Sequence, residues 1–144
     1  MVSAQRKQQG DARKDAIVVF IYAYRQVPPR RSPSLEKIAA GALATVDGQR
    51  RPLLERSAVD YHLRRMRADW ADRHRVPAPY RGLVTWVRGE HNSLRLTPKG
   101  TRHAEQLLAS DPGGFADIVA AARRAADPER GEHASERART AGQG

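Results

Sequence analysis

The segment from Arg56 to Trp70 constrains the fold more than any other part of this chain. Its large apolar residues recur at intervals of four, three and four. This spacing places them on one face of a helix with 3.6 residues per turn, so we expect that face to pack inward. The residues of this inner face are Val59, Leu63, Met66 and Trp70.

The start of this helix is indicated by Ser57 and by Asp60, three positions later. In a capping box the hydroxyl accepts a hydrogen bond from a free amide, and a carboxylate is favoured at the positive end of the helix. We therefore expect the helix to begin near Ser57. Its outer side and flanks hold Ala58, Asp60, Tyr61, His62, Arg64 and Arg65. A helix surface so rich in arginine indicates contact with a polyanion.

The charge of the whole chain agrees with this interpretation. The 144 residues include 26 Lys and Arg against 16 Asp and Glu, which gives a net charge of +10. A basic excess of this kind is typical of proteins that bind nucleic acid. We attribute the preference for arginine over lysine to GC-rich codons, but the excess and its clustering need a physical reason. The length fits one domain.

Other features disfavour several classes of protein. The chain has no cysteine, so it can form neither disulfides nor thiolate sites. Its longest apolar run, residues 16–23, is too short to span a membrane, and no signal segment is visible, so we expect a soluble cytoplasmic protein. Nucleophile–base motifs, glycine-rich phosphate loops and metal-ligand spacings are not recognisable. We therefore expect no enzymatic activity, no catalytic residue, no cofactor and no metal.

The N-terminal part of the chain predicts an arm followed by a helix. Residues 1–10 are polar and predict a flexible basic arm. The apolar stripe of residues 16–24 predicts a helix that begins at Asp11 or Asp15 and ends before Pro28. A helix this apolar is also a candidate for the contact between the subunits of a dimer, together with the two helices expected at the C-terminal end of the domain.

Two central helices are separated by a long connection. Ser34 is the expected N-cap of the first of them, with Leu35 and Ile38 facing inward. Residues 44–55 then interrupt the helical pattern, and Asp47-Gly48 indicates a turn within them. The arginine-rich helix follows this segment.

The C-terminal part begins with a connecting loop, residues 71–80. Residues 83–87 and 93–97 have the composition and alternation of strands, joined by a polar tip at residues 88–92. Thr97 is the expected N-cap of a further helix, with Pro98 in its first turn. A last amphipathic helix begins at Phe115. We therefore expect one domain over residues 11–126 and a disordered tail over residues 127–144.

This order of elements resembles the winged helix-turn-helix domain. Residues 33–39 and 57–66 are similar to the paired helices of bacterial winged-helix repressors, including the LexA-type DNA-binding domain and the MarR and ArsR groups. Residues 94–100 resemble the exit from the wing into the next helix of those proteins. The resemblance implies a mainly α fold with a small β-hairpin, a winged helix-turn-helix with an additional C-terminal helix.

The resemblance also implies the site. The helix from Ser57 would enter the major groove of double-stranded DNA as the recognition helix, and the wing would approach the backbone or the minor groove. The implied groove contacts are Ser57, Asp60, Tyr61 and Arg64, with Arg65 and Arg67 nearer phosphate. The implied wing contacts are Arg88, His91 and Asn92.

The function implied is sequence-specific DNA binding by a dimeric bacterial transcriptional regulator, most simply a repressor, located in the cytoplasm at the nucleoid. Residues 44–55 and 71–80 are longer than the connections usual in such domains. They leave open an alternative, in which the same fold is a protein-interaction or assembly module. RNA binding is a weaker alternative, because the helix lacks an exposed aromatic platform. No small-molecule effector can be inferred from the sequence.

Overall fold

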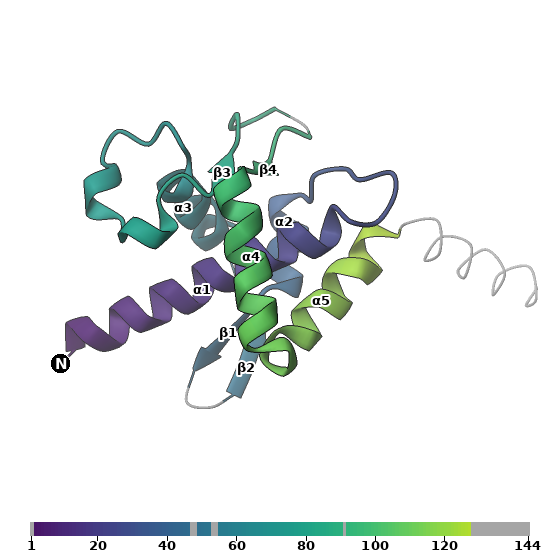
Figure 1. The fold of residues 1–144 in the computed structure, drawn as a ribbon, viewed down its shortest axis with the longest axis horizontal. Helices are drawn as coiled ribbons and strands as arrows, with labels where there is room; N and C mark the ends of the chain where they lie inside the picture. The colour runs from purple at the N-terminus through teal and green to yellow at the C-terminus, as the bar shows by residue number, and fades with distance from the viewer. Residues whose placement is uncertain (1, 47–48, 53–54, 91, 128–144) are drawn as a thin grey trace, which may run out of the picture.

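The computed structural model describes residues 2–46, 49–52, 55–90 and 92–127 (Figure 1). Within these residues the chain is mainly helical, with five α-helices, two short 3₁₀ helices and two small antiparallel sheets. The mainly α fold with a small hairpin is therefore confirmed. In chain order the elements are α1 Val2–Tyr24, α2 Leu35–Gly41, β1 Leu43–Val46, β2 Gln49–Pro52, α3 Arg56–Met66, η1 Arg73–Arg75, η2 Ala78–Tyr80, β3 Val84–Thr85, β4 Arg95–Leu96, α4 Pro98–Ser110 and α5 Pro112–Ala126.

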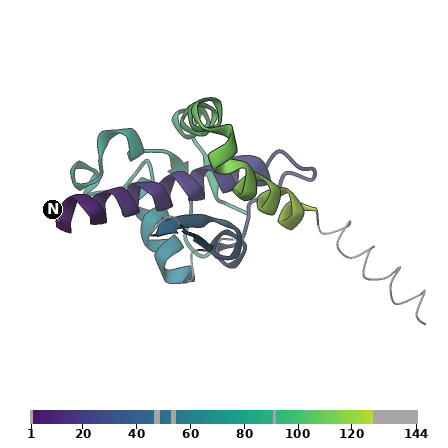
Figure 2. The same cartoon turned by 90° about the horizontal axis from the view of Figure 1, so that it is seen from below.

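Helix α1 runs through the middle of the molecule (Figure 1). It contacts α4 and α5 on one side and α2, α3 and β1 on the other, an arrangement that Figure 2 shows from below. Side chains from Ala16 to Ile21 are almost completely buried, because the helix is covered on every side. These apolar side chains are used inside a single chain, so they do not offer the free surface that a dimer contact would need.

The first helix begins earlier than the sequence indicates. Its predicted start was Asp11 or Asp15, whereas α1 begins at Val2. Residues 2–10, predicted as a flexible arm, therefore continue the helix. The sequence gives no sign of a helix here, because these residues are polar and form no apolar stripe that would require burial. The predicted tail lies outside the described residues, apart from Asp127.

Helices α2 and α3 pack against each other. The predicted N-cap is confirmed for α2 and is wrong for α3. Ser34 caps α2 as predicted, its Oγ accepting a hydrogen bond from the Lys37 amide at 3.2 Å. The prediction of a capping box at Ser57 is wrong. Helix α3 begins at Arg56, and the Ser57 hydroxyl donates to the Glu55 carboxylate at 3.1 Å instead of capping the helix.

The inner face of α3 is confirmed, because Val59, Leu63 and Met66 are all fully buried. Trp70 lies beyond the end of the helix and is half-buried against the same core. The chain that leaves α3 then joins the second sheet, since the Ala68 amide donates to the Val84 carbonyl at 3.0 Å. This hydrogen bond fixes the hairpin of β3 and β4 close to the end of α3.

Part of the long connection between α2 and α3 is a β-hairpin that the sequence did not reveal. Strands β1 and β2 pair in antiparallel register, from Leu43 opposite Pro52 to Val46 opposite Gln49. The turn predicted at Asp47-Gly48 lies outside the described residues. The sequence indicates only the turn, since two four-residue strands are too short to show a clear alternation of polar and apolar residues.

The second hairpin and the helices after it follow the prediction more closely. Strands β3 and β4 pair as Val84 with Leu96 and Thr85 with Arg95, which is shorter than expected. Thr97 caps α4 by accepting from the Gly100 amide at 3.1 Å. Helix α5 begins at Pro112, before the expected Phe115, because Asp111 provides its N-cap. No helix among the described residues is both long and apolar enough to cross a membrane.

Candidate nucleic-acid interface

The outward face of α3 carries an exposed ridge of three side chains, Ser57, Tyr61 and Arg64. Tyr61 is 49% exposed, and the Arg64 side chain is 37% exposed. Positions 57, 61 and 64 fall on one side of a helix because they are four and three residues apart. They lie opposite the buried stripe. Three of the predicted contacts are therefore available to a partner.

The hairpin of β3 and β4 is connected to α3 by a pair of charges. Asp60 Oδ2 lies 3.0 Å from Arg88 Nη2, which is a charge-assisted hydrogen bond. Asp60 Oδ1 also lies 3.7 Å from Arg64 Nε, an ion pair too long for a hydrogen bond. Asp60 is thus largely covered, with 14% of its side chain exposed. Asp60 holds Arg64 and Arg88, two of the predicted contacts, in place, and little of its own surface is accessible to a partner.

Arg65 packs across the ridge toward the segment of η1. Its guanidinium carbon lies 5.3 Å from the centre of the Tyr61 ring, and its Nη2 donates to the Arg75 carbonyl at 3.1 Å. The cation and the ring stabilise each other. Arg65 therefore orients the ring of Tyr61 while keeping its own positive charge near the surface.

His62 is buried, 5% exposed, and does not lie on the flank of the outer face. Burial, together with the positive charges of Lys14, Arg13 and Arg65, lowers the pKa of His62 to about 4. Its ring is therefore neutral at pH 7. The sequence placed it on the flank because the helical pattern alone did not show that α1 covers this side of α3.

The remaining predicted contacts are engaged within the chain or cannot be placed. Arg67 lies after α3 and donates to both carboxylate oxygens of Asp69, at 2.9 and 2.7 Å. These hydrogen bonds hold the pKa of Asp69 below its usual range. Asn92 has a positive φ of 61° and accepts from the Ser32 amide at 2.6 Å, so it shapes the hairpin tip. His91 lies outside the described residues.

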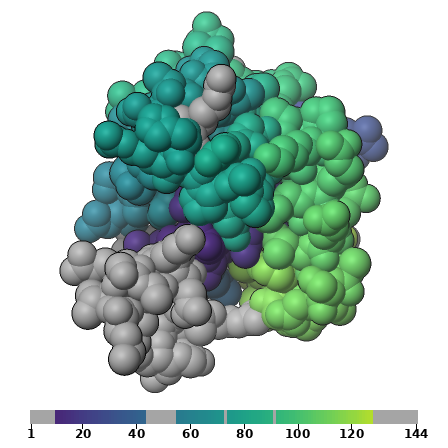
Figure 3. Space-filling view, turned by 60° about the vertical axis from the view of Figure 1, so that its left-hand side comes forward, coloured from purple at the N-terminus to yellow at the C-terminus, as the bar shows by residue number. Residues whose placement is uncertain are grey.

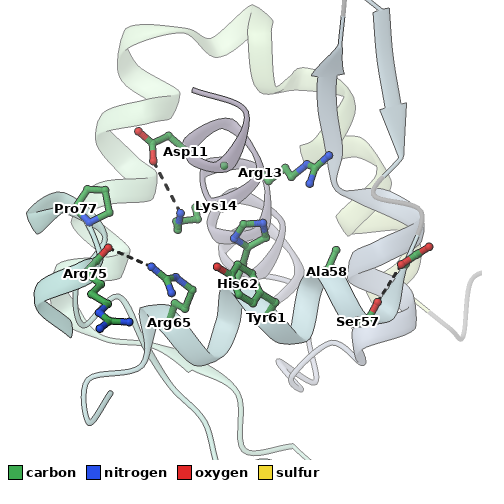
Figure 4. Close-up of a pocket in the computed structure, with 12 residues that line it drawn as sticks. Asp11, Arg13, Lys14, Ser57, Ala58, Tyr61, His62, Arg65, Arg75 and Pro77 are labelled. Atoms are coloured by element: carbon green, nitrogen blue, oxygen red, sulfur yellow. Dashed lines mark hydrogen bonds and ion pairs between the residues drawn. The ribbon is translucent and has the colours of Figure 1, made fainter. Parts of the chain in front are cut away.

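A cavity of about 600 Å³ opens beside the ridge, between α1 and α3 (Figure 4). We call it the α1–α3 cavity. In the space-filling view, the purple surface of α1 is visible between the teal segment that includes α3 and the green surface of α4 (Figure 3). The cavity is lined by Gly10, Asp11, Arg13, Lys14, Glu55, Ser57, Ala58, Tyr61, His62, Arg65, Arg75 and Pro77.

Three cations of this cavity were not among the predicted site residues: Arg13, Lys14 and Arg75. Lys14 is 7% exposed and lies three residues before Ile17, on the buried side of α1. Its helical position, on the same face as Ile17 and Ile21, was a signal that a polar group faces inward. Arg75 gave no such signal, because its place beside α3 depends on how residues 71–80 fold.

Comparison with family models, curated proteins and solved structures found no match. The resemblance to winged-helix repressors therefore stays a prediction, and the site rests on its own geometry. Within the described ranges, no three side chains of His, Asp or Glu gather as a metal-binding group. The arrangement combines an exposed helix ridge, a neighbouring hairpin that carries Arg88 and Glu90 at its tip, and a cationic cavity. Such a surface can bind a polyanion.

Proposed function

We propose that this protein binds double-stranded DNA, with α3 in the major groove and the turn between β3 and β4 beside it, in the manner of a winged helix-turn-helix protein. The observation that carries the proposal is the exposed ridge of Ser57, Tyr61 and Arg64 next to Arg88. An α-helix fits the major groove, where base edges can be read. The net charge of +10 would supply attraction to the phosphates.

The roles of the individual residues follow from their contacts. Tyr61, which is exposed, and Arg64, which is partly exposed, are the side chains on the ridge that are long enough to reach base edges, and arginine is well suited to guanine. Arg88, with 62% of its side chain exposed, is placed to meet phosphate from the hairpin. Asp60 acts through these arginines by holding them in position. Arg65 contributes positive charge beside the groove, whereas the charge of Arg67 is paired with Asp69.

A homodimeric regulator, most simply a repressor located at the nucleoid in the cytoplasm, remains part of this proposal. Two copies would place their α3 helices in successive major grooves, about 34 Å apart. The dimer contact must come from a surface other than the apolar stripe of α1, since residues 16–24 are buried in one chain except for the half-buried Tyr22. Sedimentation of the protein with and without duplex DNA measures both the oligomeric state and the stoichiometry.

The test is a titration of fluorescently labelled duplex DNA at low salt, followed by anisotropy. Arg64→Ala should weaken binding to a selected high-affinity duplex by about 1–3 kcal/mol, as expected for the loss of one base contact. Arg102→Ala removes the same charge from an exposed position on α4 and should have a much smaller effect. Failure of the wild-type protein to bind any duplex at low salt would reject the proposal.

A protein-interaction module is the second candidate, and one observation favours it. Tyr61 and Val87 are the large hydrophobic side chains that are exposed in the described part of the chain, and both lie at or near the ridge and hairpin. They could contact an apolar patch on another protein. The dependence on salt separates the two functions, because DNA binding weakens steeply as salt rises and an apolar contact does not.

A further inference from the structure

The α1–α3 cavity has the features of a ligand site in its own right. Its volume of about 600 Å³ lies within the range of roughly 300–1,000 Å³ that is common for small-molecule sites. We propose that it binds the phosphate group of a small phosphorylated ligand, held between the cations of α1, α3 and η1. This inference does not depend on DNA binding by α3.

The charges that line the cavity favour an anion. The cations are Arg13 and Lys14 from α1, Arg65 from α3 and Arg75 from η1, and they face two carboxylates, Asp11 and Glu55. The cavity therefore has an excess of two positive charges with His62 neutral. A phosphate group carries a matching negative charge of up to two. Arginine forks bind phosphate oxygens in pairs, which adds geometric specificity.

Three groups at this site are only partly compensated by neighbouring side chains. Lys14 Nζ lies 3.9 Å from Asp11 Oδ1, beyond hydrogen-bond distance, and 5.5 Å from the centre of the Tyr80 ring, and burial lowers the pKa of this ammonium group. The Nδ1 atom of His62 is buried and has no hydrogen-bond partner among the described residues, and the same is true of Arg13 Nε. Unsatisfied buried polar atoms are costly, so groups of this kind point to a missing partner.

The depth of these groups favours a small ligand over the backbone of a DNA duplex. Lys14 and His62 are only 7% and 5% exposed, and Figure 4 shows both between α1 and α3. A duplex presents its phosphates on a broad convex surface and would touch the rim. Arg75 and Tyr61, both exposed, form part of that rim. A compact phosphate group can pass them and reach the buried cations.

Inorganic phosphate and pyrophosphate are the probes that test this proposal, titrated by calorimetry into the full chain at constant ionic strength. Pyrophosphate should bind with a defined stoichiometry of one per chain. Arg75→Ala should weaken binding about tenfold, as expected when a charge-assisted hydrogen bond is lost. Arg102→Ala is the matched control, since it removes an equal charge from an exposed site on α4 and should leave affinity within about twofold.

A second variant and a spectroscopic readout keep the test decisive. Lys14→Met replaces the buried ammonium with an apolar side chain of similar length, and it should abolish pyrophosphate binding while circular dichroism stays unchanged. If Lys14→Met unfolds the chain, the imidazole resonances of His62 in the wild-type protein decide, because an anion beside the ring must shift them. Equal losses in Arg75→Ala and Arg102→Ala, or pyrophosphate binding without any shift at His62, would overturn the proposal.

A short duplex distinguishes the two sources of phosphate. If the cavity receives a free phosphorylated ligand, Lys14→Met should lose pyrophosphate binding and retain most of its affinity for the duplex. Loss of duplex binding together with an absence of pyrophosphate binding by the wild-type protein would instead assign the cavity to the DNA backbone and reject a free ligand. Neither outcome can be mistaken for failure of α3 to bind DNA, which the Arg64→Ala titration measures.

Discussion

The Asp60 carboxylate of α3 and the Arg88 guanidinium of the second hairpin form an ion pair, with Oδ2 and Nη2 3.0 Å apart. The same carboxylate lies 3.7 Å from Arg64 Nε. One acidic residue thus compensates two arginines that we propose to approach DNA. It also sets the position of the hairpin tip relative to the exposed ridge of α3. Removing the charge of Asp60 should therefore change both the electrostatic potential of this surface and the position of the hairpin relative to α3.

Asp60→Asn should strengthen non-specific binding to duplex DNA, because the two arginines lose their neutralising partner. The slope of log affinity against log salt should become steeper by up to about one unit for each additional phosphate contact. Discrimination between duplexes of different sequence should fall, since the hairpin is no longer fixed to α3. The free energy of unfolding should change by less than about 1 kcal/mol, because Arg88 is exposed. Anisotropy titrations over a salt series measure the first two effects.

Glu105→Gln provides the control for this prediction. Glu105 is exposed on α4, so the variant makes the same change in net charge at a different place. It should raise non-specific affinity much less than Asp60→Asn does. Identical salt slopes for the two variants would show that only the net charge matters, and they would contradict the proposed role of Asp60.

The sequence was sufficient to predict those parts of the fold that depend on local rules. The stripe of Val59, Leu63 and Met66 is buried as its spacing indicates, and Ser34 and Thr97 cap their helices. Such features depend on a helical period or on one hydroxyl and one amide. They can be inferred from neighbouring residues alone.

The candidate site depends on contacts between distant segments, and these the sequence could not specify. His62 is buried because α1 covers one side of α3, although its helical position is compatible with a flank. Asp60 and Arg88 were predicted to contact DNA separately, yet they contact each other across 28 positions of sequence. Arg75 reaches the α1–α3 cavity from a segment that was predicted only as a loop.

Gly100→Ala should destabilise the protein by about 1–3 kcal/mol, the cost typical of overpacking. A Cβ atom at this position would collide with the backbone carbonyl of Leu83, which leads into the second hairpin. Backbone cannot yield as a flexible side chain does, so α4 and the hairpin must separate. Gly113→Ala is the matched control, because a Cβ atom there meets nothing within 4 Å. It should be neutral or stabilising, and urea unfolding of both variants measures the difference.

His62 should make the folded state less stable in mild acid. The pKa of its ring is lowered from 6.5 to about 4 by burial and by the cations Lys14, Arg13 and Arg65. Between these two values the unfolded chain binds a proton that the folded chain does not, so the free energy of unfolding falls as pH falls. The contribution of this residue between pH 7 and pH 5 should be roughly 2 kcal/mol.

The measurement compares urea unfolding of the wild-type protein and His62→Gln at the two pH values. The variant has no imidazole at this position, so its loss of stability on acidification should be smaller by that amount, whatever its stability at pH 7. His74→Gln, at an exposed position in η1, should leave the pH dependence unchanged. If His62→Gln and the wild-type protein lose equal stability between pH 7 and pH 5, the ring is not held neutral by its surroundings.

Pyrophosphate and DNA should weaken each other's binding, because the α1–α3 cavity shares Tyr61 with the exposed ridge. An anion beside Arg65, whose guanidinium lies 5.3 Å from the Tyr61 ring centre, also reduces the positive field that a duplex would meet. Linkage requires the two effects to be equal: the factor by which pyrophosphate lowers DNA affinity must match the factor by which DNA lowers pyrophosphate affinity. Titrations in both orders at matched ionic strength measure it. Arg75→Ala should shift the effect to higher pyrophosphate concentrations, because it weakens pyrophosphate binding. An effect reproduced by sodium chloride alone would show simple screening.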